Sequence, residues 1–305
     1  MVKSYLFPGQ GSQYVGMGRD AYESNAAARS FFDEADALFG FALSDLAFSG
    51  PEEQLKDTVN QQPALYVASM ANWQWMRDEG WGEPDFLAGH SLGEFSALAA
   101  AGSLTFGDGL RLVRRRGELM KQAGEQSPGA MAAVLALPVE QIASLCAQAE
   151  DETGLVVQVA NDNCPGQIVI SGHGQALQRA VELAEEAGAR RVVRLPISIA
   201  AHSELMDSVS GAFAEAVDAV PLSEPRLPVI GNVTARPLQT VDQIRSELAA
   251  QLTSPVAWTS SMRYLLDAGT DTFVEVGPNN VLLGLVKRID RRAKRAAFDK
   301  GPDKK

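Results

Sequence analysis

Short apolar runs alternate along the chain with longer stretches in which apolar positions recur every three or four residues. Such short runs are typical of buried strands, and we predict strands at 5–7, 85–89, 227–230 and 272–276. The longer stretches predict helices at 26–38, 63–79, 92–101, 108–123, 203–219 and 241–252. Pro63 should open its helix, since proline is favoured in a first turn. Strands that alternate with helices indicate an α/β fold with a parallel sheet.

The stretch 128–195 follows a different pattern. It predicts strands at 131–137, 155–160, 167–171 and 191–195, and helices at 139–150 and 175–187. The order strand-helix-strand-strand-helix-strand is that of a ferredoxin-like subdomain. We therefore expect residues 128–195 to form a small subdomain inserted into a larger α/β domain, which is made of residues 1–127 and 196–305.

Composition is that of a soluble globular protein, because hydrophobic residues make up 46% and charged residues 21% of the 305 residues. No stretch is apolar and long enough to cross a bilayer. The two cysteines, Cys146 and Cys164, form no CxxC pair and have no metal-ligand spacing. We expect a cytoplasmic protein that holds no metal and no cofactor.

The net charge of −11 is unevenly distributed. Residues 287–305 contain nine basic and three acidic residues, so this segment carries +6 and the remainder of the chain −17. A short basic segment on an acidic body is more typical of a solvated terminus than of a nucleic-acid site. We predict that the protein binds neither nucleic acid nor membranes.

Gly89-His90-Ser91-Leu92-Gly93 matches the pattern G-x-S-x-G and lies between a predicted strand and a predicted helix. In this context the pattern indicates a nucleophile elbow, a strained turn that exposes the serine hydroxyl. The free N–H groups at the start of the following helix favour negative charge beside Ser91. The alternative is an ordinary turn between a strand and a helix, and the flanking elements favour the catalytic interpretation.

A serine hydroxyl needs a base to act as a nucleophile. Of the three histidines, His90 adjoins the serine, where adjacent side chains diverge, and His173 lies between glycines in a predicted surface turn. His202 follows a predicted strand and begins a predicted helix, so it is the best candidate, although it could simply cap that helix. Asp207 and Asp271 are possible third members by residue type, but no spacing selects either.

Several segments, in this order, resemble the malonyl-CoA:acyl-carrier-protein transacylase family, which includes the enzyme of type II fatty acid synthesis and the acyltransferase domains of polyketide synthases. The matching segments are 7–13, 89–94, 116–117, 161–167, 202, 251–256 and 275–278. Each is weak alone, but their order and spacing hold from Tyr5 to about Ile289. The family combines an α/β-hydrolase-like domain with a ferredoxin-like insert.

The resemblance implies a role for each matching residue. Ser91 would carry the acyl group as an ester, and His202 would deprotonate first Ser91 and then the incoming thiol. In this family a main-chain carbonyl near Gln251, rather than an aspartate, holds the histidine. The N–H groups of Gln10 and Leu92 would form the oxyanion hole, where one donor is typically worth about 10²–10³ in rate.

Further substrate contacts follow from the same resemblance. Asn161 would help to line the pocket. Arg116 would bind the carboxylate of a malonyl group with two parallel hydrogen bonds. The alternative is that Arg116 is one more charge of Arg114-Arg115-Arg116 on a solvated helix face. Hydrolytic relatives in polyketide pathways often lack this arginine, so its presence argues against an editing hydrolase.

One position departs from part of the family. Many malonyl-selective polyketide acyltransferases have phenylalanine directly before the catalytic histidine, where this chain has Ala201. The smaller side chain leaves room for a substituted malonyl extender such as methylmalonyl. Members of the fatty acid type with a small residue here use malonyl, and Leu92 also matches malonyl-using members, so we favour malonyl.

The function implied is transfer of a malonyl group from malonyl-CoA to an acyl carrier protein, for fatty acid or polyketide synthesis. A thioester hydrolase and a non-catalytic module that binds carrier proteins are the alternatives. Because carrier proteins are usually acidic, a local basic patch should receive the carrier on this acidic body. The candidate patches are Arg111, Arg114, Arg115 and Lys121; Arg190, Arg191 and Arg194; and the basic C-terminal segment.

Overall fold

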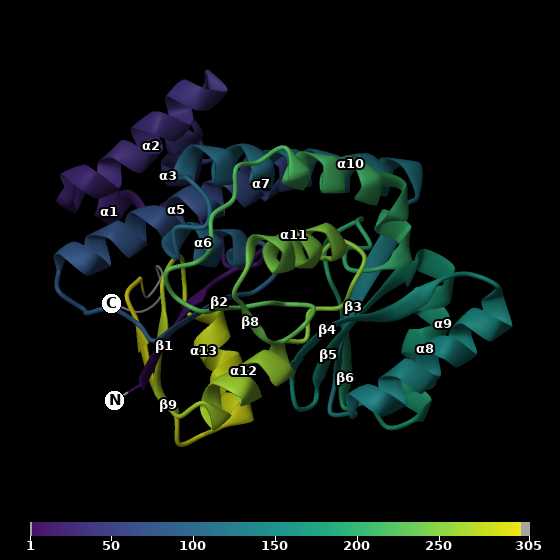
Figure 1. Cartoon of the computed structure of the whole chain (residues 1–305). Coiled ribbons are helices and arrows are strands. Elements are labelled where there is room, and N and C mark those ends of the chain that lie inside the picture. The colour runs from purple at the N-terminus through teal and green to yellow at the C-terminus, as the bar shows by residue number, and fades with distance from the viewer. Residues whose placement is uncertain (1, 300–305) are drawn as a thin grey trace.

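The structure, a computed structural model, describes residues 2–299 and contains two sheets (Figure 1). The larger sheet has the strand order β10-β9-β1-β2-β7-β8. Its strands are β1 (Val2–Phe7), β2 (Phe86–Gly89), β7 (Val229–Ile230), β8 (Pro237–Leu238), β9 (Thr270–Glu275) and β10 (Lys294–Ala297). The strands from β10 to β7 are parallel, whereas β8 is antiparallel to β7. The expected parallel sheet is therefore mixed, because a short turn joins β7 to β8 and a tight hairpin can only pair antiparallel strands.

Helices cover both faces of the larger sheet (Figure 1). Tyr5 and Phe7 of β1 pack in a core with residues of α5 (Thr58–Asp78) and α7 (Phe106–Gln126). Leu6 packs in a separate core with residues of α12 (Trp258–Asp267) and α13 (Val281–Ile289). All three side chains are fully buried, and each contributes on the order of 1.5–3 kcal/mol. Burial on both faces explains why the strand is a continuous apolar run rather than an alternating one.

The helices of the larger part are α1 (Arg19–Ser24), α2 (Ala26–Phe39), α3 (Leu43–Ser49), α4 (Glu52–Lys56), α5 (Thr58–Asp78), α6 (Gly93–Ala100), α7 (Phe106–Gln126), a 3₁₀ turn (Glu204–Met206), α10 (Asp207–Asp218), α11 (Val241–Ala250), α12 (Trp258–Asp267) and α13 (Val281–Ile289). Around the larger sheet α12 and α13 lie on one side, and the other helices lie over the opposite side, with α1, α2 and α3 outermost (Figure 1). Within residues 2–299 no helix is both long and apolar enough to cross a membrane.

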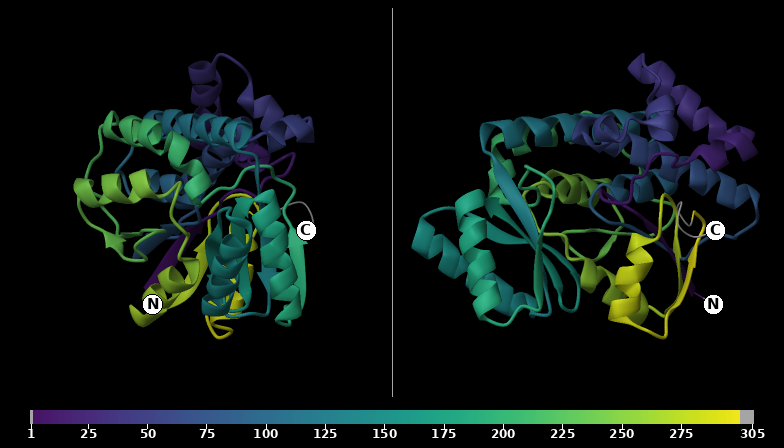
Figure 2. Two further views of the ribbon diagram at one scale, coloured as in Figure 1. Left: turned by 90° about the vertical axis from the view of Figure 1, so that its right-hand side faces the viewer. Right: turned by 180° about the vertical axis from the view of Figure 1, so that it is seen from behind.

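The smaller sheet is antiparallel and has the order β4-β5-β3-β6. Its elements are β3 (Gly129–Leu135), α8 (Val139–Thr153), β4 (Val157–Cys164), β5 (Gln167–His173), α9 (Gly174–Glu186) and β6 (Arg191–Arg194). Helices α8 and α9 lie on its outer side and share a core with it that is separate from the two cores of the larger sheet (Figure 2). The element order predicted for this stretch is the order observed.

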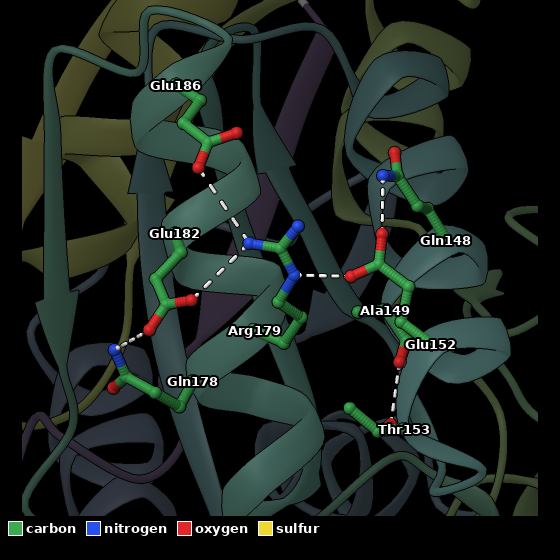
Figure 3. Close-up of polar contacts among 8 residues, drawn as sticks. All are labelled: Gln148, Ala149, Glu152, Thr153, Gln178, Arg179, Glu182 and Glu186. Atoms are coloured by element: carbon green, nitrogen blue, oxygen red, sulfur yellow. Dashed lines mark hydrogen bonds and ion pairs between the residues drawn. The ribbon is translucent and has the colours of Figure 1, made fainter.

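A polar network joins α8 to α9 on the solvent side (Figure 3). Arg179 of α9 lies 2.5 Å from a carboxylate oxygen of Glu152 on α8, and it also pairs with Glu182 and Glu186 of its own helix. These pairs are exposed, and exposed pairs stabilise a fold only weakly. The apolar faces beneath them therefore hold the two helices together.

Helix α5 begins earlier than predicted, because Thr58 rather than Pro63 opens it. The side chain of Asp57 accepts a hydrogen bond from the Val59 N–H at 3.0 Å and caps the first turn. Pro63 lies inside the helix, where its missing N–H leaves the Val59 carbonyl without its helical partner. Arg114 of α7 donates to that carbonyl at 3.1 Å, so the defect is repaired by a neighbouring helix.

The C-terminal part of the chain contains elements that the sequence pattern did not predict, namely α12, α13 and β10. Much of the basic segment is ordered, since Lys287 and Arg288 close α13 and Lys294 opens β10. Residues 300–305, the end of that segment, lie outside the described residues.

Candidate active site

Ser91 lies in the turn between β2 and α6, in a left-handed backbone conformation with φ 51°. Such a conformation costs on the order of 1–3 kcal/mol in a residue other than glycine. The turn is tightly packed: a Cβ on Gly89 would lie 2.0 Å from the carbonyl of Gly93, and one on Gly93 would lie 2.0 Å from the carbonyl oxygen of Phe7. Only glycine fits at these two positions, which explains the flanking glycines of the motif.

Asn232, in the turn after β7, supports the same turn from the side. Its Oδ1 accepts from the Ser91 N–H at 2.7 Å, and its Nδ2 donates to the Gly89 carbonyl at 2.7 Å. Asn232 is 1% exposed, so both bonds are shielded from water. They hold the strained backbone in place and occupy the N–H of Ser91 itself.

The hydroxyl of Ser91 meets the ring of His202. The distance from Ser91 Oγ to His202 Nε2 is 2.9 Å, although the two residues are 111 positions apart. On the other side of the ring, Nδ1 lies 2.8 Å from the Gln251 carbonyl oxygen and 3.2 Å from the Ser254 carbonyl oxygen. Carbonyl oxygens only accept, so Nδ1 carries the proton and Nε2 presents its lone pair to the serine hydroxyl.

No acidic side chain takes part in holding this imidazole within residues 2–299. Asp207 begins α10 and is exposed, and the carboxylate of Asp271 accepts from Thr272 instead. Two main-chain carbonyls occupy the position that an aspartate takes in a Ser-His-Asp triad. His90, by contrast, lies against the ring of Trp258 and meets Asn163, with 2.8 Å between Nε2 and Oδ1.

The imidazole of His202 is kept neutral. Burial is the main cause that lowers its pKa, to about 3, and the positive charge of Arg116 lowers it further, against the opposing effect of the two carbonyls. A pKa this far below the ordinary range leaves Nε2 unprotonated at neutral pH, so it can accept a proton.

Arg116, on α7, is 1% exposed and points from below at the nucleophile. Its Nη2 donates to Ser91 Oγ at 3.0 Å, its Nη1 to Gln62 Oε1 at 2.9 Å, and its Nε to Gln251 Oε1 at 3.1 Å. Burial lowers its pKa to about 10, and the guanidinium stays charged at neutral pH. A buried cation whose bonded partners are all neutral is an attractive site for an anion.

A cleft of about 300 Å³ opens above these groups. Ser91 and His202 lie in its wall together with Gln10, Asn161 and Ala201. The N–H groups of Gln10 and Leu92 have no acceptor among the described residues, and a Cβ on Gly9 would lie only 3.7 Å from the Leu92 nitrogen. Two unpaired donors next to the nucleophile suit a developing oxyanion. Within residues 2–299 no cluster of His, Cys, Asp and Glu side chains is suited to a metal ion.

The cleft and the residues directly behind its wall therefore combine a serine, a neutral imidazole, free N–H donors and a buried cation. Residues 4–297 match the family model described as the acyl transferase domain, which is nearly the whole chain. The chain belongs to this acyl transferase family.

Relatives of this acyltransferase cover almost its full length. A malonyl CoA-acyl carrier protein transacylase of Bacillus subtilis is 46% identical over 294 residues, which are 96% of this chain and 92% of the relative. One of Escherichia coli is 42% identical over 286 residues, 94% of this chain and 92% of the relative.

Solved structures agree with these relatives. An acyl carrier protein S-malonyltransferase of Vibrio cholerae has a TM-score of 0.95 at 40% identity, with 98% of this chain and 97% of that chain covered. A malonyl-transacylase in complex with its type II polyketide synthase acyl-carrier protein has a TM-score of 0.95 at 37% identity, with 98% and 96% covered.

All the predicted site residues of the acyltransferase converge on the cleft or directly beneath it. Sequence reasoning missed Asn232 and Gln62, and it quoted Glu94 without giving it a role. Asn232 follows a predicted strand, and the carboxyl ends of parallel strands are where α/β proteins place functional side chains, so its position was a usable signal. Gln62 offered no signal, because only the folded structure brings it to the guanidinium.

Proposed function

We propose that the protein transfers a malonyl group from malonyl-CoA to the phosphopantetheine thiol of a holo acyl carrier protein, through an ester on Ser91. The observation that carries the proposal is that one serine oxygen contacts both a neutral imidazole, at 2.9 Å, and a buried guanidinium, at 3.0 Å. The first contact supplies a base, and the second supplies a site for the carboxylate that distinguishes malonyl from neutral acyl groups. The names of the relatives agree with this substrate and acceptor.

In the first half-reaction His202 Nε2 takes the hydroxyl proton of Ser91 while Oγ attacks the thioester carbon. The carbon–sulfur bond then breaks, and the imidazolium returns the proton to the CoA sulfur. In the second half-reaction the carrier thiol gives its proton to the same nitrogen, and its sulfur attacks the ester carbon. The bond to Oγ breaks and the proton returns to Ser91, so the enzyme is regenerated.

The negative oxygen of each tetrahedral intermediate needs donors outside the Ser91 backbone, since the Ser91 N–H is bonded to Asn232. We assign this role to the N–H groups of Leu92 and Gln10, which are unpaired among the described residues and adjoin the nucleophile. Leu92 lies at the N-terminus of α6, where the helix dipole adds to the stabilisation. Asn161 and Ala201 line the cleft beside the acyl group.

The substrate carboxylate also helps the base. In the resting site the charge of Arg116 lowers the pKa of His202 and so disfavours the imidazolium that each half-reaction forms. A malonyl carboxylate paired with Arg116 compensates that charge and makes proton transfer to His202 easier. Acetyl-CoA brings no such charge, so the same pair of residues favours malonyl both in binding and in the chemical step.

Two alternatives to malonyl transfer are transfer of a substituted malonyl group and thioester hydrolysis. The small side chain of Ala201, which lines the cleft, leaves space for a substituted malonyl extender. A thioester hydrolase needs the same serine and histidine, and it differs only in letting water reach the ester.

We place the carrier protein at the edge strand β6, which the ion pairs of the surface favour. On α7, Arg111 is paired with Asp108, Arg114 and Arg115 with Glu118, and Lys121 with Asp57. These pairs largely neutralise the basic residues of α7 as a docking patch for an acidic partner.

The basic residues around β6 differ in this respect. Among residues 2–299 Arg190 and Arg191 form no ion pair, and Arg194 donates only to the neutral amide of Gln178. All three are exposed, and the chain runs from Arg194 directly into residues 195–197, which line the cleft. Charge reversal of Arg190 and Arg191 should slow transfer to the carrier while leaving acylation of Ser91 by malonyl-CoA unchanged. Equal rates for both variant and parent with the carrier would exclude this surface.

We further propose a division of the chain into two units and a location for the protein. We assign residues 128–195 to a ferredoxin-like insert, since the order β4-β5-β3-β6 is that of the four strands of such a unit, and residues 1–127 and 196–305 to an α/β-hydrolase-like domain. Both cysteines are free and buried, which suits a reducing compartment, and we place the protein in the cytoplasm.

One experiment separates the functions. The full-length protein is incubated with malonyl-CoA, with and without holo carrier protein, and both proteins are weighed by intact mass spectrometry. Transfer gives a malonyl adduct on the enzyme and then on the carrier, and Ser91→Ala abolishes both. Free malonate without a carrier adduct indicates a hydrolase, no reaction indicates a binding module, and faster transfer from methylmalonyl-CoA indicates the substituted extender.

A further inference from the structure

A buried carboxylate lies beneath the candidate site and has no part in the chemistry described above. Glu94, in the first turn of α6, is fully buried and forms no ion pair within residues 2–299. Its Oε1 accepts from the Asn232 N–H at 3.0 Å, and its Oε2 accepts from Gln251 Nε2. Burial and the negative charge of Glu247 raise the pKa of Glu94, whereas the N–H donors of Gln251 and Asn232 oppose this rise. Each carboxylate oxygen faces a donor, which favours the ionised form. A buried carboxylate without an ion pair is expensive, so the fold must gain something from it.

The gain lies in the side-chain amide of Gln251, which has one donor end and one acceptor end. Its Nε2 donates to Glu94 and, at 3.1 Å, to the Ser91 carbonyl, while its Oε1 accepts from Arg116 Nε at 3.1 Å. Which end of an amide faces which neighbour is decided by the partners. Here the two partners on one side are acceptors, and the partner on the other side is a donor.

We propose that Glu94 is a positioning residue that fixes the orientation of the Gln251 amide and thereby sets Arg116 for the carboxylate of the acyl substrate. A carboxylate suits this role because it accepts and does not donate. The Gln251 oxygen is thus turned toward Nε of Arg116, and with Gln62 on Nη1 it aims the remaining nitrogen, Nη2, at Ser91. This inference rests on the proposed transfer of a malonyl group.

Glu94→Gln tests it with almost no change of shape. An amide at position 94 can still accept from Asn232, but it then turns its own NH₂ toward the NH₂ of Gln251. Gln251 either keeps this unfavourable contact or flips, and a flip turns its NH₂ to the guanidinium and its oxygen to the Ser91 carbonyl. Either outcome disturbs the amide that holds Arg116. We expect kcat/KM for malonyl-CoA to fall about 10-fold or more, mainly through KM, because a hydrogen bond to a charged group is lost. Self-acylation by acetyl-CoA should fall less than self-acylation by malonyl-CoA, since acetyl has no carboxylate for Arg116 and the main-chain carbonyl of Gln251 still holds His202.

Glu247→Gln is the matched control. Glu247 of α11 is 2% exposed, and its carboxylate accepts from the Val233 and Thr234 N–H groups rather than from Gln251. Its charge raises the pKa of Glu94, so Glu247→Gln favours the carboxylate form of Glu94 and should not lower the malonyl-to-acetyl ratio. If a buried acid merely stabilises this region, both variants lower the melting temperature and leave the malonyl-to-acetyl ratio unchanged, and the inference is wrong. A ratio that falls only in Glu94→Gln supports it.

A second variant covers the case in which Glu94→Gln does not fold. Gln251→Met keeps the main-chain carbonyl and a side chain of similar length but removes the amide, so the malonyl-to-acetyl ratio should fall as in Glu94→Gln. A ratio that matches the parent protein overturns the inference. If the parent protein itself does not transfer malonyl, the proposed function fails instead, and the two failures are thereby distinguished.

Discussion

Replacement of Arg116 by alanine should reverse part of the substrate preference rather than lower all activity. The guanidinium is 1% exposed, so a malonyl carboxylate that enters its place is shielded from water. Without Arg116 that carboxylate would face the side-chain oxygens of Gln62 and Gln251, which now accept from the guanidinium. A buried charge without its partner costs on the order of 3–5 kcal/mol, which corresponds to about 10²–10³ in kcat/KM for malonyl-CoA.

Acetyl-CoA should respond differently to the same change. It has no carboxylate to lose, and removal of Arg116 takes away the positive charge that lowers the pKa of His202, so the base becomes stronger. We therefore expect acetylation of Ser91 by Arg116→Ala to be retained or accelerated. The malonyl-to-acetyl ratio should fall by about 10²–10³.

The assay is single-turnover acylation of Ser91 by each CoA thioester, followed by intact mass, with melting temperatures to verify folding. Arg116→Lys is the control, because it keeps the charge but loses the two-pronged geometry, and its ratio should lie between those of the other two proteins. Equal losses toward malonyl and acetyl in Arg116→Ala would refute the reasoning, since they would mean that the arginine supports the site without contacting the acyl carboxylate.

Two further predictions concern the turn and the base. Gly93→Ala should lower the free energy of unfolding in urea by about 1–3 kcal/mol or more and abolish acylation, because the new Cβ would lie 2.0 Å from the Phe7 carbonyl oxygen. Gly174→Ala is the control: its Cβ would meet nothing within 4 Å, so stability and acylation should be unchanged. The pKa of His202 is about 3 in the folded protein and near 6.5 in the unfolded chain. Between these pH values the unfolded chain binds more protons, so the stability of the fold decreases as the pH falls from about 6.5 to 3. His202→Gln should therefore lose less melting temperature over that range than the parent protein, and identical pH dependence of the two would contradict the assignment.

The sequence pattern predicted the elements of the fold wherever local signals agreed. The apolar run of β1 is bounded by a Pro-Gly turn, the motif around Ser91 lies between two predicted elements, and the 128–195 stretch alternates short apolar runs with helical periods. Strand β7 lies within the predicted strand 227–230, whereas β8, which was not predicted, has only two residues, too few to show any pattern. The start of α5 was missed because a proline, which usually marks a first turn, lies inside the helix, and Arg114 from another helix compensates for it.

The candidate site divides in the same way. Ser91 could be assigned because its neighbours in the chain form the G-x-S-x-G motif, and His202 because the chain has only three histidines to choose from. Asn232 had a signal in its place after a predicted strand, but its partners did not show. Glu94 could not be assigned at all from its neighbours, since its role comes from residues about 140 positions or more away, such as Asn232, whose N–H donates to it. Side chains whose role is to orient another side chain leave no local pattern to detect.

Gln251 holds the imidazole by its backbone and the guanidinium by its side chain. A backbone carbonyl is present in every amino acid, so a substitution at this position that keeps the backbone in place leaves the acceptor for the His202 ring. Substitutions of this side chain can therefore change which acyl groups are accepted while His202 keeps its acceptor. An insertion or deletion that shifts the loop after α11 would move both the carbonyl that holds His202 and the amide that holds Arg116.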